Sequence, residues 1–149
     1  MEISALYKIY KSKPIICTDT RNIQKGSLFF GLKGKNFNGN KFAKKAINDG
    51  CSFSVIDEKE FATNEKILLV DNVLETLQNL AKYHRKQLSI SIIGITGTNG
   101  KTTSKELIHS VLKSDLNCYA TKGNLNNHIG VPLSILSINL DHEIAIIEM

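Results

Sequence analysis

The sequence has few cysteines and no arrangement of them that would form a metal or disulfide site. Its three cysteines, Cys17, Cys51 and Cys118, are far apart and odd in number, and no Cys-x-x-Cys pair occurs. This spacing argues against both a structural zinc site and a disulfide framework. The four histidines also lack metal-ligand spacing. Because each cysteine is flanked by residues typical of strands, we expect small buried thiols.

Aromatic residues are scarce, at 7% of the chain, and they are not interleaved with basic clusters. A surface that stacks nucleic-acid bases is therefore not indicated, and we expect no nucleic-acid partner. No signal peptide and no apolar run of about 18 residues occurs, so we expect a soluble, cytoplasmic protein without membrane insertion. The net charge of +5 suits a polyphosphate ligand, although a solvated lysine surface explains it equally well.

The most informative segment runs from residue 90 to residue 103. An apolar, β-branched run leads into a glycine-containing loop, and a helical pattern follows. The loop and the start of that pattern consist of Gly97, Thr98, Asn99, Gly100, Lys101, Thr102 and Thr103. A strand, a glycine-rich turn, a Lys-Thr pair and a helix, in that order, are typical of a site that binds the phosphates of a nucleoside triphosphate. The backbone N–H groups and the helix N-terminus would face the phosphates.

The loop departs from the strict G-x-x-x-x-G-K-[ST] pattern. The position of the first glycine is occupied by Ile95, with Gly94 and Gly97 on either side of it. The alternative is a glycine-rich turn between a strand and a helix that binds no ligand.

Hydrophobic periodicity and turn residues predict alternating strands and helices. Strands are expected at residues 15–17, 27–32, 52–56, 66–70, 90–95, 117–120 and 143–149. Helices are expected at residues 3–11, 40–49, 73–87, 102–113 and 131–137. The polar segment 33–39 is expected to be a loop, and His84 a partly exposed helix residue.

This order predicts an α/β fold in two parts. Residues 1–88 form a small α/β domain, and residues 89–149 begin a doubly wound, P-loop-type parallel sheet. Three strands and two crossover helices are too few to bury both faces of a parallel sheet. We therefore expect the chain to be a fragment, or a truncated product, of a longer protein. The alternative is a compact fold in which residues 143–149 pair with the first domain.

Four segments, in this order, resemble the Mur ligase family. They are Thr18-Asp19-Thr20-Arg21, Gly26-Ser27-Leu28-Phe29-Phe30-Gly31-Leu32-Lys33-Gly34, Gly97-Thr98-Asn99-Gly100-Lys101-Thr102 and Gly123-Asn124-Leu125-Asn126-Asn127-His128-Ile129-Gly130-Val131-Pro132. The closing Ile146-Ile147-Glu148-Met149 is similar to the family strand that ends in a functional glutamate. The phosphate loop alone does not separate these ligases from folylpolyglutamate synthetases. The Asn-rich segment is most similar to the members that add D-alanyl-D-alanine.

The resemblance implies an ATP-dependent ligase of peptidoglycan precursor synthesis. In the family, ATP converts the peptide carboxylate of a UDP-linked muramoyl peptide into an acyl phosphate, which an incoming amine attacks. The implied substrates are UDP-N-acetylmuramoyl-tripeptide and D-alanyl-D-alanine, the latter bound by a region beyond this chain. Residues 1–88 would bind the UDP substrate, and residues 89–149 would begin the ATP-binding domain.

The candidate site residues follow from the motif and the resemblance. Lys101 is the catalytic candidate, because it would stabilise charge on the β/γ-phosphates during transfer. Residues Gly97 to Thr103 are the ATP-binding candidates, and Thr102 and Glu148 are the candidate Mg²⁺ ligands. For Glu148 the alternative is a solvated carboxylate at the end of the chain. For Lys101 and Thr102 the alternative is an ordinary helix start.

Substrate-binding candidates lie in two loops. Asp19, Thr20 and Arg21 follow a strand, and an arginine can pair with a diphosphate; a surface Asp–Arg pair is the alternative. Asn126 and Asn127 could bind sugar or phosphate oxygens, or they could serve only as turn residues.

Other functions remain open. The chain could be a non-catalytic binding module for a UDP-sugar or nucleotide, or another Mur-type or folylpolyglutamate-type ligase. An unrelated phosphate-loop kinase is a further alternative. We expect the isolated 149 residues not to ligate, because transfer requires both substrates in line and water excluded.

Overall fold

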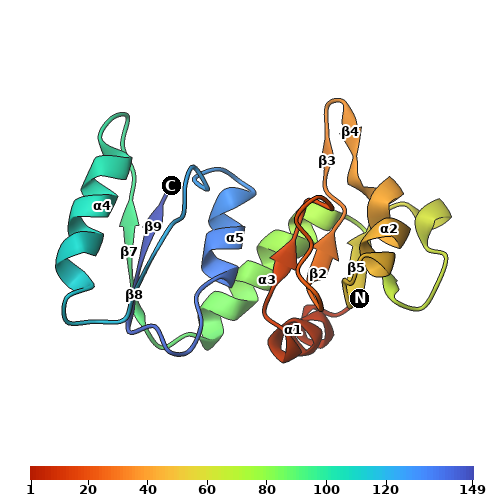
Figure 1. The fold of residues 1–149 in the computed structure, drawn as a ribbon, viewed down its shortest axis with the longest axis horizontal. Coiled ribbons are helices and arrows are strands. Elements are labelled where there is room, and N and C mark those ends of the chain that lie inside the picture. Colours follow the sequence, from red (N-terminus) through yellow and green to blue (C-terminus); the bar gives the residue numbers. More distant parts are fainter. The chain divides into compact units, whose positions relative to one another are not determined.

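The computed structural model describes residues 1–149 and divides into two compact units, Met1–Leu80 and Ala81–Met149. Each unit contains its own parallel sheet (Figure 1). The predicted α/β class with parallel sheets is therefore confirmed. Each unit is described by itself below.

The first unit is built on a four-stranded sheet in the order β1-β2-β5-β6, with every pair parallel. Its elements are α1 (Ile3–Ser12), β1 (Ile16–Cys17), β2 (Leu28–Phe30), β3 (Lys33–Gly34), β4 (Phe37–Asn38), the 3₁₀ turn η1 (Gly39–Phe42), α2 (Ala43–Asn48), β5 (Phe53–Ile56), η2 (Lys59–Phe61) and β6 (Ile67–Leu69). Helix α3 (Val73–Gln87) begins in this unit and ends in the second. All three residues of β2 are buried, as expected for an inner strand of a parallel sheet.

Cysteine thiols contribute to the core of the first unit. Cys17 and Cys51 are buried with Phe29 and Ala46 in one apolar cluster, and the Cys51 sulfur lies 3.2 Å from the Ser27 hydroxyl. Burial is the largest cause that raises the pKa of each of these two thiols. The predicted buried thiols are thus confirmed for Cys17 and Cys51, whereas Cys118 is only half-buried.

The segment 33–39, predicted to be a loop, contains a short antiparallel hairpin instead. Strands β3 and β4 pair Lys33 with Asn38 and Gly34 with Phe37. Each strand is only two residues long, which is too short to produce an alternating pattern in the sequence. The following segment, predicted as one helix, starts as the 3₁₀ turn η1 and becomes α-helical only at Ala43.

The second unit is a three-stranded parallel sheet in the order β7-β9-β8. Its elements are β7 (Ser91–Ile95), α4 (Lys101–Leu112), β8 (Cys118–Ala120), α5 (Gly130–Leu136) and β9 (Ile144–Glu148). Figure 1 shows α4 and α5 on opposite sides of this sheet. The last strand lies between the other two, so the alternative in which residues 143–149 pair with the first domain is excluded.

The core of the second unit explains a wrong prediction about His84. This side chain is 5% exposed, not partly exposed, and its Nε2 lies 2.8 Å from the Ile138 carbonyl oxygen. Burial lowers the pKa of His84, and the hydrogen bond to Ile138 opposes that effect. The partner is 54 residues away in the sequence, so helical spacing alone gave no sign of it.

None of the helices combines the length and the apolar character that crossing a membrane requires.

Candidate functional site

The phosphate-loop candidate connects β7 to α4 in the second unit. Residues 96–100 are exposed, and Gly100 has φ 75° and ψ 2° at the position before the first helical residue. That left-handed conformation is unfavourable for residues with a Cβ and readily adopted by glycine. Lys101 folds back over the loop, and its Nζ donates to the Gly97 carbonyl oxygen at 2.6 Å. The loop therefore presents backbone, a lysine and a helix N-terminus at one place.

Glu148 lies beside this loop because of the strand order. Strand β9 pairs directly with β7, and the register places Glu148 opposite Ile95, the residue where β7 ends. The Glu148 side chain is only 1% exposed. The expectation of a functional carboxylate at this strand end stays a prediction, but the alternative of a solvated carboxylate is wrong.

Two side chains of the candidate set contact the Glu148 carboxylate. The Thr102 hydroxyl lies 3.1 and 3.2 Å from its two oxygens, and Asn126 Nδ2 donates to Oε1 at 2.9 Å. The amide of Asn126 is the main cause that holds the pKa of Glu148 below its usual value; burial opposes it, and Thr102 and the charges of Lys105 and Lys101 lower it further. Glu148 is thus held as an anion next to the phosphate loop.

The buried Lys105 belongs to the same cluster, although the sequence reasoning missed it. It is 1% exposed, and its Nζ lies 3.7 Å from Glu148 Oε2. A signal was present in the sequence, because Lys105 follows Lys101 by four residues and therefore shares its face of the helix.

The two asparagines have different surroundings. Asn126 contacts Glu148, as described above. The Asn127 side chain instead accepts hydrogen bonds from the backbone N–H groups of Ile129 and Gly130, at 3.0 and 2.8 Å. These donors lie at the start of α5, so Asn127 performs the turn chemistry that was the alternative to substrate binding.

Asp19, Thr20 and Arg21 lie in the first unit, after β1. The Arg21 guanidinium donates to both carboxylate oxygens of Asp19, with Nη2 to Oδ2 at 2.6 Å. Hydrogen bonds from the Arg21 side chain, and then from the Arg21 backbone N–H, lower the pKa of Asp19 to about 2. The surface Asp–Arg pair is therefore present, and the Arg21 side chain remains 86% exposed and accessible to a ligand.

The donor atoms available for a metal ion are few. No group of three or more His, Cys, Asp or Glu side chains could hold one. Thr102 and Glu148 place a hydroxyl and a carboxylate oxygen side by side, and magnesium commonly takes one or two such protein oxygens together with phosphate oxygens and water. The donor set thus fits a magnesium ion that arrives with a nucleotide.

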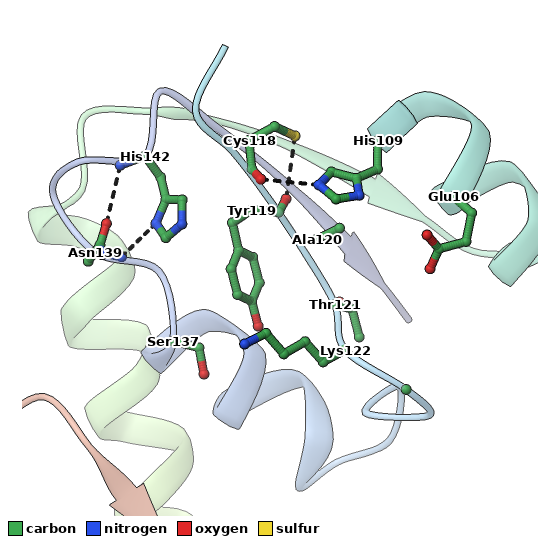
Figure 2. Close-up of a pocket in the computed structure, with 11 residues that line it drawn as sticks. Glu106, His109, Cys118, Tyr119, Ala120, Thr121, Lys122, Ser137, Asn139 and His142 are labelled. Atoms are coloured by element: carbon green, nitrogen blue, oxygen red, sulfur yellow. Dashed lines mark hydrogen bonds between the residues drawn. The ribbon is translucent and has the colours of Figure 1, made fainter. Parts of the chain in front are cut away.

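A groove of about 590 Å³ runs along β8. Figure 2 shows His109 and Glu106 on the α4 side, and Ser137, Asn139 and His142 on the other. The His109 ring nitrogen lies 3.3 Å from the Cys118 carbonyl oxygen. None of the candidate residues from the sequence lines this groove, so it is separate from the phosphate loop.

Comparison with known proteins links the chain to one family. The family model for the "Mur ligase family, catalytic domain" matches residues 14–85, and the model for the "Mur ligase middle domain" matches residues 95–149. The UDP-N-acetylmuramoyl-tripeptide--D-alanyl-D-alanine ligases of Bacillus subtilis and Synechocystis sp. are 41% and 42% identical, over 90% of this chain in both cases. The chain spans about 30% of the length of these relatives.

Solved structures agree with these matches. The crystal structure of the MurF ligase from Thermotoga maritima in complex with ADP has a TM-score of 0.80 and 32% identity, covering 91% of this chain and 31% of that one. A MurF structure from Acinetobacter baumannii has a TM-score of 0.82 and 33% identity, covering 90% of this chain and 30% of that one.

Proposed function

The chain belongs to the Mur ligase family, and on that premise we propose that it provides the UDP-substrate domain and the phosphate loop of an enzyme that adds D-alanyl-D-alanine to UDP-N-acetylmuramoyl-tripeptide. Residues 1–88 form the UDP-substrate domain, and residues 89–149 begin the ATP-binding domain. The reaction consumes ATP in the cytoplasm and contributes to peptidoglycan precursor synthesis.

The observation that carries this proposal is the placement of Glu148. Its buried carboxylate lies beside the Thr102 hydroxyl and next to a glycine-containing loop. Buried charges are costly unless they are paired or bind a metal, and the carboxyl ends of parallel strands are where α/β sheets bind ligands. An ATP-dependent ligase accounts for the loop, the hydroxyl and the carboxylate together.

Each residue has a stated role in the proposal. Lys101 leaves the Gly97 carbonyl and stabilises negative charge on the β/γ-phosphates while the phosphoryl group moves to the peptide carboxylate. The backbone of Gly97 to Gly100, with Thr103, holds the remaining phosphate oxygens. Thr102 and Glu148 would hold Mg²⁺, which neutralises phosphate charge.

The substrate-binding roles follow from exposure and hydrogen-bonding capacity. Arg21 pairs with the diphosphate of the UDP group, while Asp19 holds the guanidinium in place and Thr20 lies between them in the same loop. Asn126 has one amide hydrogen committed to Glu148 and donates the other to substrate. Asn127 contributes to substrate binding only indirectly, through the turn that its side chain stabilises.

A nucleotide titration tests the proposal. The 149-residue chain is titrated with ADP and Mg²⁺ by calorimetry, in parallel with Lys101→Ala and with Lys113→Ala, an exposed lysine at the other end of α4. We expect the parent and Lys113→Ala to bind alike, and Lys101→Ala to bind at least about tenfold more weakly, because a charge-assisted contact is lost. Equal binding by all three proteins, or no binding by the parent, would contradict the phosphate-loop assignment.

A second candidate function is a binding module that does not catalyse ligation. The exposed phosphate loop favours it for the isolated chain, because phosphoryl transfer to a carboxylate requires water to be excluded. Incubating the 149 residues with ATP, Mg²⁺, UDP-N-acetylmuramoyl-tripeptide and D-alanyl-D-alanine distinguishes a ligase from a binding module. Formation of the pentapeptide product would eliminate the binding-module alternative. Failure to bind the UDP substrate while ADP binds would instead contradict the proposed UDP-substrate role of residues 1–88.

A further inference from the structure

Lys105 is a buried ammonium in the second turn of α4. Its side chain is 1% exposed. Its Nζ donates to the Thr121 carbonyl oxygen at 2.8 Å and lies 3.1 Å from a Glu106 carboxylate oxygen and 3.7 Å from Glu148 Oε2. A lysine is almost never fully buried unless it is paired. The three surrounding oxygens therefore account for its position.

Thr121 links Lys105 to the strand that carries Glu148. Its carbonyl oxygen accepts from Lys105, and its hydroxyl oxygen accepts from the backbone N–H of Glu148 at 3.0 Å. Lys105 thus connects α4 with the carboxyl ends of both β8 and β9. The Glu148 carboxylate is held at Oε2 by Lys105 and at Oε1 by Asn126.

Lys105 and Lys101 differ in what they can reach. Lys101 is half-buried, and its Nζ contacts a carbonyl oxygen of the exposed loop. Lys105 is enclosed and engaged by oxygens from three other residues. A phosphate that binds the exposed loop can reach Lys101, whereas the surrounding chain shields Lys105.

We infer that Lys105 is a positioning residue, which holds the Glu148 carboxylate beside the Thr102 hydroxyl so that both oxygens are in place before a Mg²⁺–nucleotide complex binds. This inference rests on the proposed function of Thr102 and Glu148. Lys105 acts through Glu148 and Thr121 and does not touch the nucleotide. Its loss therefore weakens nucleotide binding only when magnesium is present and only when Glu148 is intact.

A double-mutant cycle tests this dependence. ADP affinity is measured by calorimetry, in Mg²⁺ and in EDTA, for Lys105→Met, Glu148→Gln, the double variant and the exposed control Lys113→Met. We expect Lys105→Met to lose about tenfold in affinity in Mg²⁺ and less than about twofold in EDTA, and the double variant to match Glu148→Gln, as for two residues that act as one unit. Losses that multiply in the double variant, or equal losses in Mg²⁺ and EDTA, would overturn the inference.

Urea unfolding of the same proteins without nucleotide provides a readout that does not depend on the proposed function. Removing one member of a buried pair leaves the other uncompensated, and removing both is much less costly. We therefore expect the effect of the double variant on the unfolding equilibrium constant to differ by at least about fivefold from the product of the two single-variant effects. Additive effects would show that Lys105 does not hold Glu148. If the parent protein fails to bind ADP, the proposed function fails, and this unfolding cycle still decides whether the two residues are coupled.

The comparison of the double variant with Glu148→Gln covers the case in which Lys105→Met alone does not fold. Both proteins lack the Glu148 charge, and only one retains the buried ammonium. We expect the double variant to unfold at no lower urea concentration than Glu148→Gln, and a clearly lower midpoint would overturn the inference.

Discussion

Replacing Gly100 with alanine tests whether the conformation of the phosphate loop matters. Gly100 has φ 75°, and a Cβ added there would have no heavy atom within 4 Å. Steric contact is therefore not the issue, and the cost is the left-handed backbone conformation alone. For a residue with a Cβ that conformation costs about 1–2 kcal/mol.

This cost appears either in stability or in nucleotide affinity. If Gly100→Ala keeps the loop conformation, the free energy of unfolding falls by about 1–2 kcal/mol. If the loop relaxes to avoid the strain, stability is retained, and ADP affinity falls by about five- to thirtyfold because binding must restore the conformation. The two losses together should amount to about 1–2 kcal/mol.

Urea unfolding and ADP calorimetry measure both quantities on the same samples. Gly123→Ala is the matched control, because Gly123 also has a positive φ, 55°, with nothing within 4 Å of an added Cβ, and it lies outside the phosphate loop. This control should lose stability and keep its ADP affinity. Gly100→Asn should recover part of the loss, since asparagine tolerates the left-handed region. If Gly100→Ala matched the parent in both measurements, the conformational argument would be refuted.

Three further predictions concern single side chains. Asn127→Ala should lower the free energy of unfolding by about 0.5–2 kcal/mol in urea titrations, because the start of α5 loses two hydrogen bonds; an unchanged midpoint would contradict that capping role. Burial lowers the folded-state pKa of His84, so the contribution of His84 to stability should be complete above pH ~6.5 and should decline as the pH falls toward the lowered pKa. The urea midpoint measured against pH should lose this decline in His84→Gln. An identical pH profile in both proteins would show that another group is responsible. In Arg21→Ala, the pKa of Asp19 measured by NMR should rise from about 2 toward its ordinary value of 3.8, and UDP binding should weaken while thermal unfolding stays unchanged. A pKa that remains near 2 would mean that the Arg21 side chain is not the main cause.

Much of the secondary structure could be predicted from local patterns. The helix expected at residues 73–87 has those bounds in the structure, because apolar residues recur along it at helical spacing. The strand–loop–helix order at the phosphate loop also agrees. The hairpin of β3 and β4 was missed, since two-residue strands leave no periodic signal.

The candidate site was only partly predictable. Thr102 and Glu148 were paired only as candidate Mg²⁺ ligands, from motif and resemblance, and Asn126 was identified separately, with no sign in the sequence that it contacts Glu148. Lys105 was missed because a lysine in an amphipathic helix ordinarily lies on the solvated face. The burial of His84 was missed because its hydrogen-bond partner lies 54 residues away in the sequence.

The sequence by itself determined where most strands and helices form and which loop is the candidate for phosphate binding. Those properties depend on backbone conformations and side-chain periodicity within a few residues. Only the tertiary structure decided that β9 lies between β7 and β8, and this strand order brings Glu148 to Thr102 across 46 residues of sequence. Contacts over that distance are set by which strands pair, and strand pairing depends on how the whole sheet packs against its helices.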